Sequence, residues 1–320
     1  MKPFLADALH TRAVLNAHSF AFQKHLGQNF LIDPSVPENI VRAAELTKDD
    51  VVLEIGPGIG TMTQYLAEAA GKVIAVEVDE KLLPILADTL APWNNVRVIH
   101  KDILKTDLAA LLSEESPDRP VKVVANLPYY ITSLILMKLL ESSAYVSRIT
   151  VMVQEEVAQR IAAGPGTKAY GALSLSVQYY AHPRLALHVA PHSFMPQPEV
   201  SSAVVDLVRY ETPPVEVQDE QFLFSLIRAS FLQRRKTLVN GLLGSPQLGL
   251  KKENILHALL VIGKDPLVRG ETFTLEDFAA LANALLPLCA SSPDGTPAHA
   301  SSTKYLAGNS QEDLIQRSSL

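Results

Sequence analysis

The sequence has only one cysteine, Cys289, among 320 residues. A single cysteine excludes an intramolecular disulfide and any cysteine-rich metal site, which favours a reducing compartment such as the cytoplasm. The histidines give no metal signal either, because His182, His188 and His192 have no cysteine partner. The sequence therefore predicts no metal site.

Long apolar runs are also missing. The N-terminus lacks the continuous apolar region of a signal peptide, and no later run approaches the roughly 18 residues of a membrane span. We therefore expect a protein that is neither secreted by this route nor inserted into a membrane.

Positive charge is not in excess. The chain has 28 Lys and Arg residues against 34 Asp and Glu, a formal net charge of −6. This balance argues against a protein that binds nucleic acid over its whole surface, so any nucleic-acid site must be a local patch. The length and the 48% hydrophobic residues allow a full α/β domain and a smaller second domain.

Short runs rich in β-branched residues alternate with helical stretches over the first two hundred residues. The predicted strands are 51–55, 72–78, 96–100, 121–126 and 148–154. The predicted helices are 60–69, 80–90, 131–141 and 155–163. This alternation predicts an α/β fold, with a doubly wound and mostly parallel sheet between helices. Two later β-like runs, 184–190 and 202–210, are expected to pair antiparallel at one sheet edge.

A change of pattern follows the segment 211–217, whose consecutive prolines stop both helix and central strand. Beyond it, apolar residues recur at i, i+3, i+4 and i+7, which predicts a small helical domain. From Ala290 onward the chain is rich in Ser, Gly, Pro and Ala, as is typical of a disordered tail. The predicted organisation is a first domain over 1–212, a helical domain over 213–289 and a tail over 290–320.

Three glycines, Gly56, Gly58 and Gly60, follow the first predicted strand and precede a helix, where they allow close approach of a ligand. Their G-x-G-x-G spacing differs from the pyrophosphate loop, and a glycine turn alone can be purely structural. Glu77 ends the next strand about 20 residues later, where nucleotide-binding folds place a carboxylate for ribose hydroxyls. Asp102, after the third strand, could meet an adenine edge or simply cap a turn. Together they predict a ribose-bearing cofactor, and an NAD dehydrogenase or an S-adenosylmethionine methyltransferase would fit.

The tetrapeptide Asn126-Leu127-Pro128-Tyr129 ends the fourth predicted strand, where ligands of open α/β sheets bind. The Asn126 side-chain oxygen and the Leu127 carbonyl, held by a rigid proline turn, can accept both hydrogens of one adenine amine. The nitrogen lone pair then leaves conjugation with the ring and can attack an electrophilic methyl group without a strong base. Tyr129 offers a ring for the base to stack on. A plain strand-ending turn is the alternative, and the upstream glycine loop and Glu77 weigh against it.

Six motifs make the sequence resemble the ribosomal RNA adenine dimethyltransferases, most closely the small-subunit (16S) enzymes known as kasugamycin-resistance dimethylases. In order they are HLGQNFLID (25–33), LEIGPGIGTMT (53–63), VIAVEVD (73–79), NLPYYI (126–131), FMPQPEVSSAVV (194–205) and FLQRRKTLVN (231–240). The similarity runs from Thr11 to Leu288. It implies a Rossmann-like methyltransferase domain with S-adenosylmethionine as cofactor, followed by a small helical RNA-binding domain.

The resemblance also implies roles for individual residues. Cofactor contacts would fall on Asn29, Leu31, Gly56, Gly58, Glu77, Asp102 and Asn126. The target base would be held by Asn126, Leu127, Pro128 and Tyr129, with Phe194 covering its other face. An N-terminal segment, 11–33, would contact RNA and cofactor, while Tyr130 has no assigned role.

A basic cluster, Arg234, Arg235 and Lys236, lies at or near a predicted helix end. Helical geometry would spread the three side chains around the helix, and a solvated helix face is one interpretation. Contact with RNA phosphates is preferred in the family context, because it supplies the local patch that the acidic net charge requires. Lys24 makes the N-terminal segment a second candidate for RNA contact.

The implied activity is dimethylation of the 6-amino groups of two adjacent adenosines in the 3′-terminal hairpin of small-subunit ribosomal RNA. The expected partner is the immature 30S subunit, with a role in small-subunit biogenesis, and we expect a cytoplasmic monomer. A resistance-type dimethylase of large-subunit ribosomal RNA shares the catalytic motifs, but the segment FLQRRKTLVNGL and the fuller helical region favour the small subunit. A third hypothesis, from another class, is a ribosome-assembly binding factor.

Overall fold

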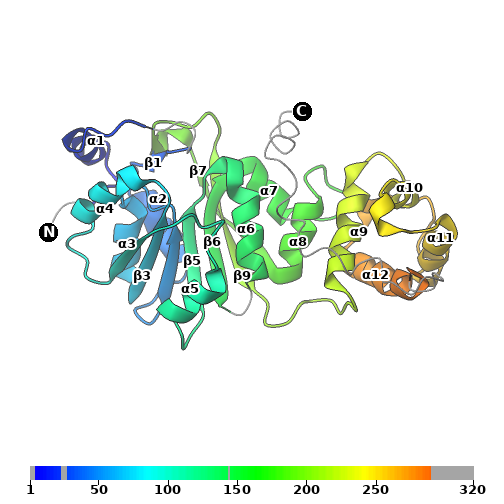
Figure 1. Cartoon of the computed structure of the whole chain (residues 1–320). Helices are drawn as coiled ribbons and strands as arrows, with labels where there is room; N and C mark the ends of the chain where they lie inside the picture. The colour runs from blue at the N-terminus through cyan, green and yellow to red at the C-terminus, as the bar shows by residue number, and fades with distance from the viewer. Residues whose placement is uncertain (1–3, 23–26, 143–144, 290–320) are drawn as a thin grey trace. The chain divides into compact units, whose positions relative to one another are not determined.

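The computed structural model describes residues 4–22, 27–142 and 145–289 (Figure 1). The chain divides into two compact units, the first formed by Met1–Ala162 and Tyr180–Glu211, the second by Ala163–Tyr179 and Thr212–Leu320. The division after Glu211 falls where the prolines begin. The structure differs from the predicted domains in one segment, 163–179, which was expected in the first domain but packs with the second unit. Within that segment, Tyr170 donates a hydrogen bond to the Phe273 carbonyl (2.8 Å). The predicted tail, 290–320, lies outside the described residues.

A seven-stranded sheet forms the centre of the first unit, with strand order β4-β3-β2-β5-β6-β9-β7. Its strands are β2 (Val51–Ile55), β3 (Lys72–Glu77), β4 (Val96–His100), β5 (Val121–Asn126), β6 (Val146–Gln154), β7 (Ala181–Val189) and β9 (Ser202–Arg209). The strands from β4 to β6 are parallel, and β9 pairs antiparallel with both β6 and β7. The α/β class is confirmed, and so is the antiparallel pair. The pair lies at one edge of the sheet as expected, with β7 outermost and β9 between β7 and β6.

Helices pack on the strands of the first unit (Figure 1). They are α1 (Ala8–Ala17), α2 (Ser35–Ala43), α3 (Thr61–Ala69), α4 (Leu83–Thr89), α5 (Leu108–Glu115), α6 (Thr132–Glu141) and α7 (Glu155–Ala162). One core cluster joins Ile40 of α2 and Leu66 of α3 to Val73 and Val124 of the central strands. The strands are rich in Val and Ile because both faces of a parallel sheet are buried.

One predicted helix is divided in the structure. Residues 80–90 form a short 3₁₀ turn, η2 (Glu80–Leu82), followed by α4. A proline in the first turn of α4 explains the break, because proline lacks the N–H that a continuous helix would need there.

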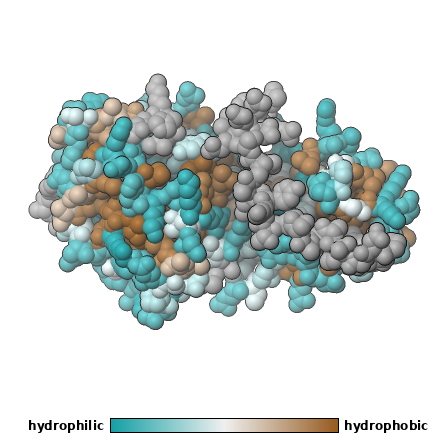
Figure 2. Space-filling view, in the orientation of Figure 1, coloured by the Kyte–Doolittle hydropathy of each residue, from teal (hydrophilic) through white to brown (hydrophobic). Residues whose placement is uncertain are grey.

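The second unit is helical. It contains most of α8 (Ala172–Tyr180), then α9 (Glu220–Leu232), α10 (Leu238–Leu243), α11 (Lys252–Val261) and α12 (Leu275–Cys289). Its core includes the fully buried rings of Phe222, Phe273 and Phe278. None of the helices described in either unit has the length and apolar character to cross a bilayer. The visible faces carry hydrophilic side chains interspersed with hydrophobic ones (Figure 2).

Candidate active site

A cavity lies at the carboxyl ends of the parallel strands in the first unit. Its lining comes from 27–31, 54–58, 61–62, 76–78, 101–103 and 126–131, with Leu82 and Ile135. The strands β2, β3 and β5 lie side by side, so the residues that end them meet at one edge of the sheet. This edge is where open α/β sheets bind their ligands.

The three glycines of the loop have different surroundings. Gly56, Gly58 and Gly60 all have positive φ values, of 70°, 61° and 91°, which strain any residue with a Cβ. A Cβ at Gly56 would meet no atom within 4 Å, whereas one at Gly58 would lie 3.0 Å from the Phe30 ring and one at Gly60 3.0 Å from Leu90. Gly56 therefore borders open cavity space, and the other two allow tight packing behind the loop.

Glu77 ends β3 with its side chain almost completely buried, at 4% exposure. Its carboxylate accepts hydrogen bonds from the backbone N–H groups of Gly58 (3.3 Å), Val78 (2.8 Å) and Asp79 (2.8 Å). Burial raises the pKa of Glu77, and these three hydrogen bonds oppose the rise. The result is a fixed, desolvated carboxylate on the cavity wall, suited to accept hydrogen bonds from ribose hydroxyls.

Glu54 is a cavity residue that the sequence analysis missed. It is 1% exposed, and its Oε2 has no hydrogen-bond partner among the described residues. Burial, with a smaller contribution from the Glu77 charge, raises the pKa of Glu54 to about 8. Such an orphaned acceptor fits a ligand that brings a hydrogen-bond donor or a positive charge. Its signal in the sequence was its position, two residues before the first glycine of the loop.

Asp102 both caps a turn and lines the cavity. Its Oδ1 accepts from the Leu104 N–H (2.9 Å), as expected of a turn cap, while its side chain remains 33% exposed. The predicted N-terminal contacts Asn29 and Leu31 line the same cavity, next to the glycine loop.

Two segments far apart in the chain hold the predicted tetrapeptide. The Asn126 Nδ2 donates to the carbonyl of Asn29 (3.2 Å), 97 residues earlier. The Leu127 N–H donates to the Met152 carbonyl of β6 (3.1 Å), and the Pro128 carbonyl accepts from the Thr132 hydroxyl (3.0 Å). With its nitrogen engaged, Asn126 retains its Oδ1 as an acceptor for a ligand.

The two tyrosines of the turn differ in burial. Tyr129 is half-buried, and its hydroxyl lies 2.7 Å from the Ser202 hydroxyl. Burial raises the pKa of Tyr129, while the Ser202 hydrogen bond opposes the rise. Tyr130 is 56% exposed and lines the cavity with Asp102, which adds to the effect of burial in raising its pKa.

Phe194 does not belong to the cavity lining. It forms β8 (Phe194–Met195), which pairs antiparallel with β1 (Phe30–Leu31), and it is 1% exposed within a core cluster that includes Leu31 and Ile40. The predicted stacking role of Phe194 thus remains a prediction, because in this structure its ring contacts the core.

The basic cluster of the second unit lies in the turn between α9 and α10. Arg234 is engaged there, donating to the carbonyls of Lys168 (2.7 Å) and Thr167 (3.3 Å) and pairing with Glu271 (3.3 Å). Arg235 and Lys236 are exposed. The prediction that helical geometry spreads these three side chains around a helix is wrong, because α9 ends at Leu232, before the cluster begins.

Lys24, the other predicted RNA contact, lies outside the described residues. Among the residues that the structure does describe, no group of three or more His, Cys, Asp or Glu could hold a metal ion.

The fold and the cavity, with a Rossmann-like sheet, a glycine loop and a buried carboxylate at a strand end, are those of an S-adenosylmethionine-dependent methyltransferase. Residues 19–266 match the family of ribosomal RNA adenine dimethylases, to which this chain belongs. The NAD dehydrogenase alternative is thereby excluded.

Named relatives agree with this assignment. The chain is 56% identical, over 88% of its length and 98% of the relative, to ribosomal RNA small subunit methyltransferase A of Lachnoclostridium phytofermentans. It is 49% identical to the protein of the same name from Lysinibacillus sphaericus, over 89% of this chain and 98% of that one.

Solved structures with the same architecture also come from this group. The 23S rRNA methyltransferase ErmE matches 80% of this chain and 99% of its own, with a TM-score of 0.62 and 26% identity. A dimethyladenosine transferase from Plasmodium falciparum matches 79% and 95%, with a TM-score of 0.64 and 25% identity.

Proposed function

We propose that this enzyme dimethylates the 6-amino groups of two adjacent adenosines in the 3′-terminal hairpin of small-subunit ribosomal RNA. Its partner is the immature 30S subunit, on which it acts as a cytoplasmic monomer during small-subunit biogenesis. Similarity to small-subunit methyltransferases over nearly their whole length supports this choice of RNA. The observation that carries the chemistry is the anchored Asn126, whose Oδ1 is left to accept from an amine.

The cavity residues fit S-adenosylmethionine, which supplies an electrophilic methyl group when bound. Gly56 leaves space at the loop, and Glu77 offers its carboxylate to the ribose hydroxyls. The unpartnered acceptor of Glu54 suits a cofactor that carries an ammonium and a sulfonium group. Asp102, together with Asn29 and Leu31, completes the proposed contacts.

The tetrapeptide prepares the adenine amine for attack. The Asn126 Oδ1 and the Leu127 carbonyl accept its two hydrogens, which turns the nitrogen lone pair out of conjugation with the ring. Tyr129 holds the base by stacking, a contact worth about 1–3 kcal/mol in nucleic-acid sites. No strong base is needed, because the amine proton becomes acidic once the nitrogen has gained its methyl group. The catalytic effect therefore comes from positioning and electrostatics.

RNA binding is assigned to exposed basic side chains. Arg235 and Lys236 in the second unit are accessible for phosphates, and Arg12 is exposed on α1 in the first unit. These local positive charges allow an acidic protein to bind an RNA backbone.

Methyl transfer into purified small subunits from a strain that lacks the enzyme tests the proposal. With tritiated S-adenosylmethionine, nucleoside analysis should yield dimethyladenosine. Primer extension across both ribosomal RNAs of the deletion strain distinguishes this proposal from methylation of the large subunit, because dimethyladenosine blocks the extension. Loss of the block at the small-subunit adenosine pair supports the proposal, and loss only in the large subunit refutes it.

The Asn126→Ala variant separates catalysis from binding. We expect it to abolish methyl transfer and to leave small-subunit binding nearly intact, because the substitution removes one acceptor at the cavity. Asn39→Ala is the matched control, since Asn39 is a half-buried residue of α2 and does not belong to the cavity lining. Dimethylation by Asn126→Ala at the normal rate would show that the role given to Asn126 is wrong.

A further inference from the structure

Ser202 is a buried polar residue with a fixed backbone. It is the first residue of β9 and has 0% exposure. Its backbone pairs on one side with Gln154 of β6 and on the other with Val189 of β7. Because neighbouring strands hold it on both sides, the Ser202 hydroxyl has a defined position at the carboxyl end of the parallel strands.

That hydroxyl contacts the residue on which the target base is proposed to stack. The oxygens of Ser202 and Tyr129 lie 2.7 Å apart, and the two residues are 73 positions apart in the sequence. Tyr129 begins η3 (Tyr129–Ile131), a short 3₁₀ turn that supplies little packing of its own. A hydrogen bond at the tip of the ring adds a second fixed point to that of the backbone, so that the position of the ring and the direction of its long axis are defined.

We propose that Ser202 is a positioning residue for adenine methylation: its hydroxyl holds the Tyr129 ring in place at the turn where the target base stacks. The inference rests on the proposed function, since it requires an adenine bound at the turn of Asn126 and Tyr129. Ser202 does not touch the base or the cofactor in this scheme. It acts through Tyr129 alone, and this restriction makes the proposal testable.

A double-mutant cycle measures whether Ser202 acts through Tyr129. The variants are Ser202→Ala, Tyr129→Phe and the double variant, each removing a hydroxyl without changing the shape of the backbone. We expect each single variant to lower kcat for methylation of small subunits about three- to tenfold, the rate equivalent of one hydrogen bond. The double variant should lose no more than either single one, because both substitutions break the same contact.

Two further readouts separate positioning from general damage. The affinity for S-adenosylhomocysteine, measured by calorimetry, should change less than about twofold in Ser202→Ala, because Ser202 does not touch the cofactor. In an RNA hairpin with 2-aminopurine at the target position, stacking should quench the fluorescence less with Ser202→Ala than with the wild-type enzyme. Ser201→Ala is the matched control, because Ser201 contributes its backbone carbonyl, which accepts from Glu155 N–H (3.0 Å).

The outcomes are distinct. An unchanged kcat in Ser202→Ala, or losses that multiply in the double variant, would overturn the inference. A parallel loss of cofactor affinity and thermal stability would also overturn it, since it would assign Ser202 a purely structural role. A wild-type enzyme that fails to methylate small subunits would instead refute the proposed function, and this measurement precedes the cycle.

Discussion

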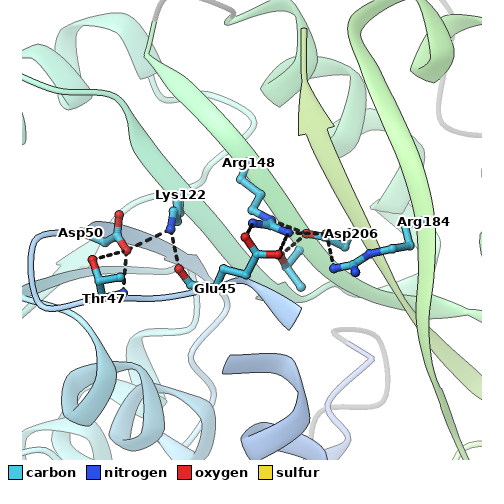
Figure 3. Close-up of polar contacts among 8 residues, drawn as sticks. Glu45, Thr47, Asp50, Lys122, Arg148, Arg184 and Asp206 are labelled. Carbon is cyan, nitrogen blue, oxygen red and sulfur yellow. Dashed lines mark hydrogen bonds and ion pairs between the residues drawn. The ribbon is translucent and has the colours of Figure 1, made fainter. Parts of the chain in front are cut away.

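Removal of the Asp206 carboxylate is expected to destabilise the first unit strongly, because it leaves a buried guanidinium without its main partner. Asp206 lies on β9 with 0% exposure and accepts from Arg148 Nε and Nη2 (both 2.8 Å), the Thr150 hydroxyl (2.9 Å) and Arg184 Nη2 (3.0 Å) (Figure 3). Burial alone would raise the pKa of Asp206, but the hydrogen bonds from Arg148 and Thr150 hold it below its ordinary value.

The magnitude follows from where the charges lie. The Arg148 side chain is only 11% exposed, so Asp206→Ala removes one partner of a buried ion pair, a change that costs about 3–5 kcal/mol. For a unit of this size, each kcal/mol lowers the melting temperature by about 2–4 °C, which gives a decrease of about 6–20 °C. Glu45 pairs with the same guanidinium at 2.6 Å, but its side chain is 63% exposed. Glu45→Ala should therefore destabilise the protein much less, because solvent screens an exposed charge.

Tryptophan fluorescence provides the assay, because Trp93 is the only tryptophan of the chain and lies in the first unit. Urea titrations of the wild-type protein, Asp206→Ala and Glu45→Ala at pH 7 give the free energies of unfolding. Equal losses in the two variants, or a loss below about 1 kcal/mol in Asp206→Ala, would refute the argument that burial decides the cost.

The same variant has a defined pH dependence. A carboxyl group whose pKa is lowered by folding stabilises the protein above its unfolded pKa of about 3.9, and this stabilisation is lost as the pH falls through the folded pKa. The difference between wild-type protein and Asp206→Ala should therefore be largest at neutral pH and should shrink below about pH 4.

Three other predictions follow from the same structure. Glu54, with its pKa raised to about 8, is protonated when folded, so its contribution to stability is full below pH 4.5 and is lost as the pH rises to about 8. Glu54→Gln should therefore gain stability relative to the wild-type protein as the pH rises across this window, by at most about 5 kcal/mol. A difference in unfolding free energy that stays constant with pH in urea titrations would contradict this. Replacing Arg235 and Lys236 by alanine should weaken RNA binding and lower its salt dependence, with little change in melting temperature, whereas Arg234→Ala should mainly lower the melting temperature. Gly58→Ala should weaken binding of S-adenosylhomocysteine in calorimetry and destabilise the first unit, because its φ of 61° strains a residue with a Cβ and that Cβ would lie 3.0 Å from the Phe30 ring. Wild-type affinity would contradict the loop geometry.

The parallel half of the sheet could be predicted because its signals are local. Each of the five strands is a short β-branched run between helices, and such runs are buried wherever helices cover both faces of a sheet. The position of β9 between β6 and β7 could not be predicted. Pairing of Ser202 with Gln154 joins segments far apart in the chain, and nothing local specifies that register. The assignment of 163–179 to the second unit has the same cause.

Residues of the site could be predicted wherever the end of a strand determines their position. Gly56, Glu77 and Asn126 end neighbouring parallel strands, so they had to meet at one edge. The position of Glu54 two residues before the glycine loop is a local signal, but its missing hydrogen-bond partner depends on side chains from other elements. The core position of the Phe194 ring, set by pairing of β8 with β1, also has no local signal, and its stacking on the base stays a prediction.

The polarity of the Asn126 side chain shows why a motif alone does not make this site. A carboxamide presents an oxygen or a nitrogen according to its rotation, and only the oxygen can accept from an amine. The Asn29 carbonyl can accept but not donate, so it selects the rotamer in which the nitrogen of Asn126 faces it. The N-terminal segment that lines the cofactor cavity thereby also sets the side chain that is proposed to hold the target amine. In the proposed mechanism this one hydrogen bond joins the cofactor and base sites, so the orientation of Asn126 depends on the segment 27–31.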